Sequence, residues 1–285
     1  MTVDATGSRR ARAAQGRRRA GVTGVLGEIL LSLGVVVLLY VVWQMWVGDW
    51  IYGAQNNAAG QELSAQWEQQ QPGPDALPIP GFDPDATPSE DPVEIAPVIA
   101  PEPADAEIFA LMRVPRWGDD YATAIAGGVS RARTLDHIGI GHYPGTQMPG
   151  ELGNFALAAH RTTWGAPFAR IADLHVGDPI VIESPDGWYT YRFRTLEYVT
   201  PDAIDVLLPV PQAPGVHANE RYITLTSCSP RFSLAERIVA YGVFEGFQPR
   251  ADGPPASLRG QSAEAAASTD STSAAPTAHA TNGVR

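Results

Sequence analysis

The residue best suited to covalent chemistry is a cysteine that has no second cysteine in the chain. Cys228 ends an alternating strand pattern, Tyr222-Ile-Thr-Leu-Thr-Ser-Cys, and Ser229-Pro230 follow at once. A lone thiol is often a buried, inert residue. At the end of a strand that faces a loop it is more accessible, and its thiolate form is a strong nucleophile. Cys228 is therefore a candidate nucleophile.

A positive charge is expected close to this thiol. Arg237 opens the next strand pattern, Arg237-Ile-Val-Ala-Tyr-Gly-Val-Phe, nine residues after Cys228. If the two strands pair through the short loop between them, Cys228 and Arg237 lie near each other at one end of the sheet. A guanidinium there would favour the thiolate and could bind a developing oxyanion. Arg231, within the loop, is a rival for this role.

A cysteine nucleophile also needs a group that transfers protons, and the sequence holds six His. His160 ends the strand pattern Asn154-Phe-Ala-Leu-Ala-Ala, and His142 follows Gly139-Ile-Gly141, which we interpret as a turn. Spacing alone leaves both as candidates for general acid and base. Surface positions are expected for His175, His217 and His279.

The composition excludes several classes of protein. With 44% hydrophobic and 18% charged residues, the chain is not disordered throughout. One Cys can form neither an internal disulfide nor a cysteine-based zinc site. The net charge of -11 argues against nucleic acid as the main partner.

An uncharged stretch, ILLSLGVVVLLYVVWQMWVG, indicates a membrane span. At about 1.5 Å per helical residue it covers roughly 30 Å, the thickness of a bilayer core. Residues 1–20 carry six Arg, whereas residues 49–107 carry twelve acidic and no basic residues. Because Arg concentrates on the cytoplasmic side, we expect a single-pass anchor in the plasma membrane with a cytoplasmic N-terminus. A cleaved signal peptide is the alternative.

The whole chain divides by composition into five segments. We expect a cytoplasmic basic N-terminus (1–20), a transmembrane anchor (21–48), an acidic, proline-rich extracytoplasmic stalk (49–107), a catalytic domain (108–249) and a disordered Ala/Ser/Thr-rich tail (250–285). About 140 residues suit one compact domain.

That domain is predicted to be mainly β. Ile180–Ser184 and Trp188–Phe193 flank Pro185-Asp186-Gly187, a strong signal for a hairpin turn. Strands at short spacing with few helices suggest a closed or nearly closed barrel. Further strands are expected at 154–159, 221–226 and 237–244, and a short helix at 167–174.

Three sequence blocks resemble those of the sortases. They are Gly141-His-Tyr-Pro-Gly-Thr, Pro149-Gly-Glu-Leu-Gly-Asn-Phe-Ala-Leu-Ala-Ala-His-Arg-Thr-Thr and Thr224-Leu-Thr-Ser-Cys-Ser-Pro-Arg. With the Arg-rich N-terminus, single span and acidic stalk, the layout looks like the class E sortases of actinobacteria. The resemblance implies a sortase-type closed β-barrel of about eight strands with short helices, preceded by one transmembrane helix.

The resemblance also implies a reaction. Cys228 would attack the Thr–Gly bond of an LAXTG-like or LPXTG-like sorting signal at the C-terminal end of a secreted protein. His160 would be the general acid and then the base, and Arg237 would hold the substrate or the oxyanion. The thioacyl intermediate would pass to a peptidoglycan precursor amine, or to a pilin lysine, which anchors the surface protein in the cell wall.

Three further residues are expected at the substrate. Tyr143 lies in the segment associated with the choice between LAXTG and LPXTG. Thr226 and Ser227 would hydrogen-bond the substrate, or alternatively satisfy the edge of the strand. Ser227 stands where the family usually has Thr, which keeps the hydroxyl. The sequence shows no acidic cluster resembling a calcium site, so we predict neither a metal nor a cofactor.

Three other readings stay open. An L,D-transpeptidase also places a His before a Cys, but its Ser-x-Gly-Cys-x-Arg pattern is absent. Another cell-wall cysteine hydrolase is the second alternative, although the cell-wall endopeptidases with Cys before His have the opposite order. A non-catalytic, membrane-tethered binding module on a sortase-like barrel is the alternative from a different class. The joint presence of Cys228, His160 and Arg237 argues against it.

Overall fold

The computed structural model describes residues 21–43, 48–70 and 95–259, in two compact units. The first unit contains α1 (Val22–Val42), a helix of 21 residues whose side chains are all exposed. This helix is long and apolar enough to cross a bilayer, so it is compatible with a single-pass anchor. The predicted basic N-terminus, most of the proline-rich part of the predicted stalk and most of the predicted tail lie outside the described residues.

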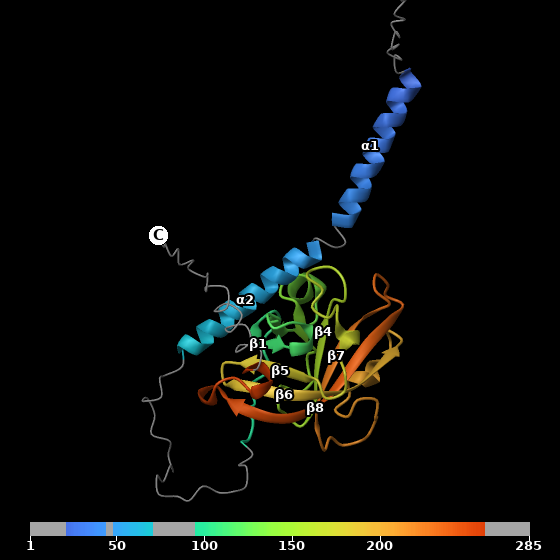
Figure 1. Cartoon of the computed structure of the whole chain (residues 1–285). Coiled ribbons are helices and arrows are strands. Elements are labelled where there is room, and N and C mark those ends of the chain that lie inside the picture. Colours follow the sequence, from blue (N-terminus) through green and yellow to red (C-terminus); the bar gives the residue numbers. More distant parts are fainter. Residues whose placement is uncertain (1–20, 44–47, 71–94, 260–285) are drawn as a thin grey trace, which may run out of the picture. The chain divides into compact units, whose positions relative to one another are not determined.

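The second unit is built around a closed β-barrel (Figure 1). The barrel order is β1-β2-β3-β4-β7-β8-β6-β5, with β5 pairing back to β1. The strands are β1 (Ile108–Arg113), β2 (Thr123–Gly127), β3 (Ile140–His142), β4 (Gly153–Ala159), β5 (Pro179–Ser184), β6 (Gly187–Val199), β7 (Arg221–Ser229) and β8 (Glu236–Pro249). The predicted closed barrel of eight strands is confirmed.

Short helical turns connect several strands. They are η2 (Pro115–Trp117), η3 (Arg131–Leu135), η4 (Ile171–Asp173), η5 (Ile204–Leu207) and η6 (Arg250–Asp252). The helix expected over 167–174 is reduced to the three residues of η4. Pro167 fits the start of a helix, but the chain takes up regular helical turns only four residues later.

The predicted strands are confirmed where apolar and polar residues alternate over several positions. The hairpin around Pro185-Asp186-Gly187 is the β5–β6 pair, which closes at Ser184 and Gly187. The strands expected near 154, 221 and 237 are β4, β7 and β8. The residues 139–141, interpreted as a turn, instead lead into β3, which pairs in parallel with β2. β3 escapes recognition because a strand of three residues with a central glycine carries no alternation.

Side chains alternate between the inside and the outside of the barrel along each strand. From the three strands at its centre, the hydrophobic core takes Phe155, Leu157, Ala159, Ile223, Leu225, Ile238 and Ala240. The residues between them therefore face outward, among them Ala158 on β4, Thr226 on β7 and Val239 on β8. Outward residues of β4 and β7 stay largely covered, since Ala158 is 8% and Thr226 5% exposed.

β4 and β7 run parallel, although they are far apart in the sequence. Their register runs from Gly153 opposite Arg221 to Ala158 opposite Thr226. Hydroxyl groups of β7 reinforce this register by donating hydrogen bonds to β4: Thr224 to the Asn154 side chain (2.7 Å), Thr226 to the Leu157 carbonyl (3.2 Å) and Ser227 to the Ala159 carbonyl (2.8 Å).

A helix that the sequence did not indicate packs on the barrel. α2 (Gly48–Gln70) occupies the first part of the expected stalk. Its buried residues, Gly60, Ser64 and Trp67, are spaced four and three apart, so they share one helix face. This stretch is thus part of the folded unit rather than an extended spacer. The docking face consists of small residues and one aromatic ring, which is why no apolar periodicity marks it.

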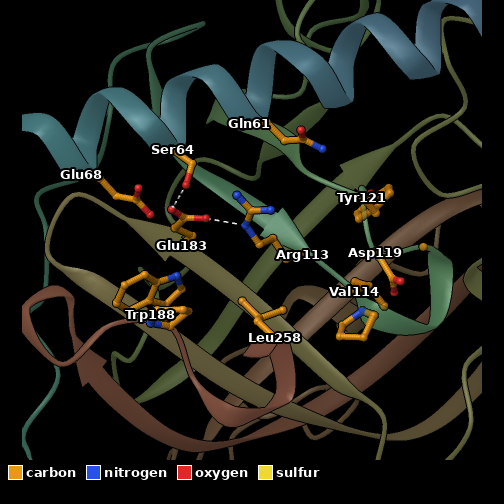
Figure 2. Close-up of a pocket in the computed structure, with 13 residues that line it drawn as sticks. Gln61, Ser64, Glu68, Arg113, Val114, Asp119, Tyr121, Glu183, Trp188 and Leu258 are labelled. Atoms are coloured by element: carbon orange, nitrogen blue, oxygen red, sulfur yellow. Dashed lines mark hydrogen bonds and ion pairs between the residues drawn. The ribbon is translucent and has the colours of Figure 1, made fainter. Parts of the chain in front are cut away.

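Figure 2 shows the centre of this helix–barrel contact. Ser64 donates a hydrogen bond of 2.5 Å to Glu183, a carboxylate only 1% exposed that also pairs with Arg113 and Arg250. Burial alone would raise the pKa of Glu183, but the charge of Arg113 and the hydrogen bonds outweigh it and hold the pKa below its ordinary value. A cavity of about 330 Å³ lies beside this cluster, away from Cys228.

The contact extends to the chain that follows the barrel. Arg250, in the expected tail, is 6% exposed and stacks over Trp67 of α2 and Trp188 of β6, at 5.6 and 4.7 Å from the ring centroids. The folded unit therefore runs past residue 249, the expected end of the domain. A guanidinium between two rings and a carboxylate gains cation–π and ionic stabilisation together.

Replacing Gly60 by Ala tests how closely α2 docks. A Cβ at Gly60 would lie 1.9 Å from the Ala122 carbonyl oxygen, which belongs to backbone. Although Ala favours a helix by about 1 kcal/mol over Gly, we expect Gly60→Ala to lower the free energy of unfolding by about 1–3 kcal/mol. Denaturant unfolding of the full chain in detergent measures this. Gly246→Ala, where a Cβ meets nothing within 4 Å, is the matched control; equal stability of both variants would contradict close docking.

Candidate active site

Cys228 lies near the end of β7, on the outward side of the barrel. Ile223 and Leu225 point into the core. Because side chains alternate along a strand, Cys228 lies on the outward side of β7, the same side as Thr224 and Thr226. Its side chain is partly exposed. The antiparallel register pairs Cys228 directly with Arg237 on β8. The expected proximity of thiol and guanidinium is thus present in the strand register.

His160 comes to the same level from the other side. It directly follows β4, whose Ala158 lies opposite Thr226 in the parallel β4–β7 register. Extended by two residues past this last pair, the same register sets His160 opposite Cys228. Residues opposite each other on neighbouring strands project from the same face of a sheet, with strands about 4.8 Å apart. Cys228 on β7, Arg237 on β8 and His160 just after β4 therefore lie in one row, which we call the Cys–His–Arg row.

His142, the other candidate for proton transfer, lies inside the barrel. On β3 it pairs with Leu157, a core residue, and it is 1% exposed. Its ring packs against Phe109 and Phe155. Nε2 lies 3.0 Å from the Gln147 carbonyl oxygen, so this nitrogen carries the proton. His142 is therefore a structural residue of the core, separated from Cys228 by the barrel wall.

A carboxylate that the sequence did not indicate completes the row. Asp136, just after η3, places Oδ1 2.6 Å from Nε2 of His160. Both side chains are well covered, with exposed fractions of 13% for His160 and 16% for Asp136. Because a carboxylate accepts, Nε2 carries a proton and Nδ1 is left for proton exchange. Asp136 lies 24 residues before His160 in a loop without a motif, so only the fold reveals the pair.

Arg237 is anchored at the end of the β7–β8 loop. Its Nη1 donates to the carbonyl oxygens of Leu234 (3.2 Å) and Glu236 (3.0 Å). Within the described part of the chain, Nε and Nη2 make no hydrogen bond, so these donors are available to a ligand. Arg231, the rival, lies in the exposed loop beyond Ser229-Pro230 and is not level with Cys228.

The three expected substrate-binding residues have different positions. The hydroxyl of Tyr143 lies 3.0 Å from Oγ1 of Thr226, so these two expected residues contact each other on the outward face. Ser227 points inward, is 3% exposed and donates to the Ala159 carbonyl. Its hydroxyl is therefore committed to the β4–β7 pairing, which favours the alternative role given to it from the sequence.

No group of three or more His, Cys, Asp or Glu side chains that could hold a metal ion occurs among residues 21–43, 48–70 and 95–259. The row itself combines a thiol, an imidazole backed by a carboxylate, and a guanidinium. Such a set can support nucleophilic attack on a carbonyl, proton transfer and stabilisation of an oxyanion.

Comparison with known proteins agrees with this fold. Residues 112–245 match the sortase domain family. Sortase SrtE1 from Streptomyces coelicolor is 34% identical over 256 residues, covering 88% of this chain and 65% of that protein. Sortase SrtE2 from the same organism is 29% identical over 260 residues, covering 86% of this chain and 93% of the relative.

Solved structures of sortases are also similar to this chain. The crystal structure of sortase E1 from Streptomyces coelicolor with a tripeptide in the active site is 38% identical, with a TM-score of 0.51, covering 55% of this chain and 99% of that one. SrtA sortase from Actinomyces oris is 34% identical, with a TM-score of 0.54, covering 57% and 93%.

The chain belongs to the sortase family, and its similarity is to the class E members. It spans 65% of the length of SrtE1, the first of the curated relatives. The predicted family resemblance is thereby confirmed. The match runs from the end of β1 into β8 and includes Cys228, His160 and Arg237.

Because His142 is buried, we expect the free energy of unfolding to fall in acid. Burial lowers the pKa of His142, and its hydrogen bonds and the nearby Glu102 and Glu151 only partly offset this. The unfolded chain then binds the proton more readily, so this stabilisation is complete above about pH 6.5 and is lost as the pH falls through the folded-state pKa. We expect wild-type stability to fall between pH 7 and 5.

Thermal unfolding of His142→Gln at several pH values measures how much His142 contributes to the pH dependence of stability. The variant is expected to be less stable at pH 7 but to lose stability with acid less steeply, by up to about 1.4 kcal/mol per pH unit. His175→Gln, at an exposed position, is the control and should keep the wild-type slope. Parallel slopes for all three proteins would show that His142 is not the group responsible.

Proposed function

We propose that this protein is a cysteine transpeptidase that cleaves the Thr–Gly bond of a sorting signal and transfers the new acyl end to a cell-wall amine. The observation that carries the proposal is the Cys–His–Arg row, in which Cys228 pairs with Arg237 on one side and the β4–β7 register leads to His160 on the other. Membership of the sortase family supports the same assignment.

The first half-reaction forms a thioacyl enzyme. The Cys228 thiolate attacks the carbonyl carbon of the threonine, and the carbonyl oxygen takes up negative charge facing the free donors of Arg237. The C–N bond then breaks. Protonated His160 gives its proton to the departing glycine amine, which leaves the acyl group joined to sulfur and His160 neutral.

The second half-reaction releases the product. An amine attacks the thioester carbonyl, and neutral His160 accepts a proton from it. The C–S bond breaks and Cys228 leaves as a thiolate, so thiolate and imidazolium are both restored. The incoming amine belongs to a peptidoglycan precursor or, in the alternative, to a pilin lysine.

Asp136 is a positioning residue in this scheme. Its 2.6 Å contact with Nε2 holds the His160 ring and directs Nδ1 to the proton exchange. The carboxylate also balances the charge of the imidazolium, which protonates the departing amine in the first half-reaction and is restored by the proton of the incoming amine in the second. The same division of labour, with an acid that orients a histidine, recurs in hydrolases of unrelated fold.

The outward side of the barrel beside the row carries the residues that we assign to peptide binding. Tyr143 stands beside Thr226 there, with its hydroxyl 3.0 Å from Oγ1 of that threonine. Sortase E1 from Streptomyces coelicolor has been crystallised with a tripeptide in its active site. We assign the sorting signal to this face here, with Tyr143 beside the residue that distinguishes LAXTG from LPXTG.

The anchor and the charge pattern suggest where the reaction takes place. α1 is compatible with a single membrane pass, and the six Arg before it favour a cytoplasmic N-terminus. The barrel then lies outside the plasma membrane. Its partners are secreted proteins with a C-terminal sorting signal, which reach the same side.

Peptide assays test the proposed reaction directly. We expect the full chain in detergent to cleave LAXTG or LPXTG peptides between Thr and Gly and to join the acyl part to added diaminopimelate or glycine. Cys228→Ala should form neither product, because no thioacyl intermediate can arise. Mass spectrometry identifies the products and any adduct on Cys228. Cleavage that persists in Cys228→Ala, or a folded wild type inert toward both peptides, would contradict the proposal and favour a binding role.

Asp136→Asn tests the positioning of His160. The amide keeps the size of the side chain but removes its charge, so we expect kcat to fall about 10- to 100-fold with KM nearly unchanged. Arg131→Ala is the control. Nε of this exposed arginine lies 3.7 Å from Oδ1 of Asp136, and Arg131 is not part of the row. A kcat of Asp136→Asn equal to that of Arg131→Ala would remove Asp136 from the mechanism.

A further inference from the structure

The loop that begins at His160 has an unfavourable backbone. Thr163, Trp164, Gly165 and Ala166 have consecutive φ angles of 67°, 54°, 80° and 44°. Only Gly adopts this left-handed region freely, and other residues incur about 1 kcal/mol or more each. Such a run persists only where surrounding contacts hold it.

The first two turns of α2 supply those contacts. Asp49 accepts a hydrogen bond of 2.9 Å from the backbone N–H of Thr163. The rings of Tyr52 and Trp164 lie 5.9 Å apart. Gly53 and Gly165 bring the two backbones together, because a Cβ on Gly165 would lie 2.9 Å from the nitrogen of Gly53.

The same loop also contacts the segment that carries Asp136. Trp164 packs edge-on against His137 at 6.0 Å between ring centroids, and His137 directly follows Asp136. The loop closes back on its first residue, since the N–H of Phe168 donates to the His160 carbonyl at 3.0 Å. Trp164 thus lies between α2 and the segment that carries the carboxylate partner of His160.

We propose that the start of α2 positions His160, with Asp49 and Tyr52 as the positioning residues and Trp164 as the link. The inference rests on the proposed transpeptidase function and assigns a catalytic consequence to a helix outside the barrel. Only residues 43–47 separate α2 from α1 in the sequence, so the chain next to the apolar helix takes part in shaping the site. A barrel without α2 would keep Cys228 and Arg237 in register but leave the His160 loop unsupported.

Variants of the full chain in detergent separate positioning from general stability. Asp49→Ala and Tyr52→Ala are expected to lower kcat about ten-fold with KM within about two-fold, because the peptide still binds while the proton donor is displaced. Tyr52→Phe keeps the ring and should restore wild-type kcat. Ser64→Ala is the matched control, since it removes the bond from α2 to Glu183 far from the loop. It should lower the melting temperature without lowering kcat.

Amide hydrogen exchange over residues 160–168 gives a readout independent of substrate. We expect exchange in this loop to become about ten-fold faster in Asp49→Ala and Tyr52→Ala and to stay at the wild-type rate in Ser64→Ala. Unchanged exchange in the first two variants, or faster exchange with wild-type kcat, would overturn the inference. If the wild type cleaves no peptide, the proposed function fails by itself, and the exchange rates alone decide whether α2 supports the loop.

Discussion

The parallel pairing of β4 with β7 is the constraint on which the site depends. A shift of one residue between these strands would turn every side chain of one strand to the other face and separate His160 from Cys228. Hydroxyls of Thr224, Thr226 and Ser227 bind β4 across the pair, each contributing about 1 kcal/mol. The hydroxyl residues that precede Cys228 on β7 therefore fix the register that brings His160 close to Cys228.

Much of the Cys–His–Arg row could be predicted because its sequence signals are local. Cys228 and Arg237 each lie at the end of an alternating pattern, and a short loop between two strands brings such ends together. His160 and His142 could not be separated in this way. Their difference arises from β3, whose pairing with β4 sends His142 inward, and this strand was too short to recognise.

The features that escaped prediction have a common physical character. Asp136 reaches His160 from a different connection of the barrel, so no spacing encodes the pair. α2 docks through Gly53 and Gly60, which approach backbone closely, through the Ser64–Glu183 hydrogen bond and through the single ring of Trp67, rather than through an apolar stripe. Hydrophobic periodicity, the main signal for a helix that packs on a domain, is therefore missing from it. Steric fit and tertiary hydrogen bonds become visible only in three dimensions.

The closed barrel limits the ways in which a peptide can bind to it. β7 is paired with β4 as far as Thr226 on one side and with β8 as far as Ser229 on the other, so residues 222–226 of the strand that carries Cys228 have no free edge. Along this stretch an extended peptide cannot join the sheet as an additional strand and gain affinity from main-chain hydrogen bonds. Recognition at the outward face must come from side-chain pockets and single polar contacts. Short signals defined by the identity of a few residues, rather than by a propensity to be extended, suit such a surface.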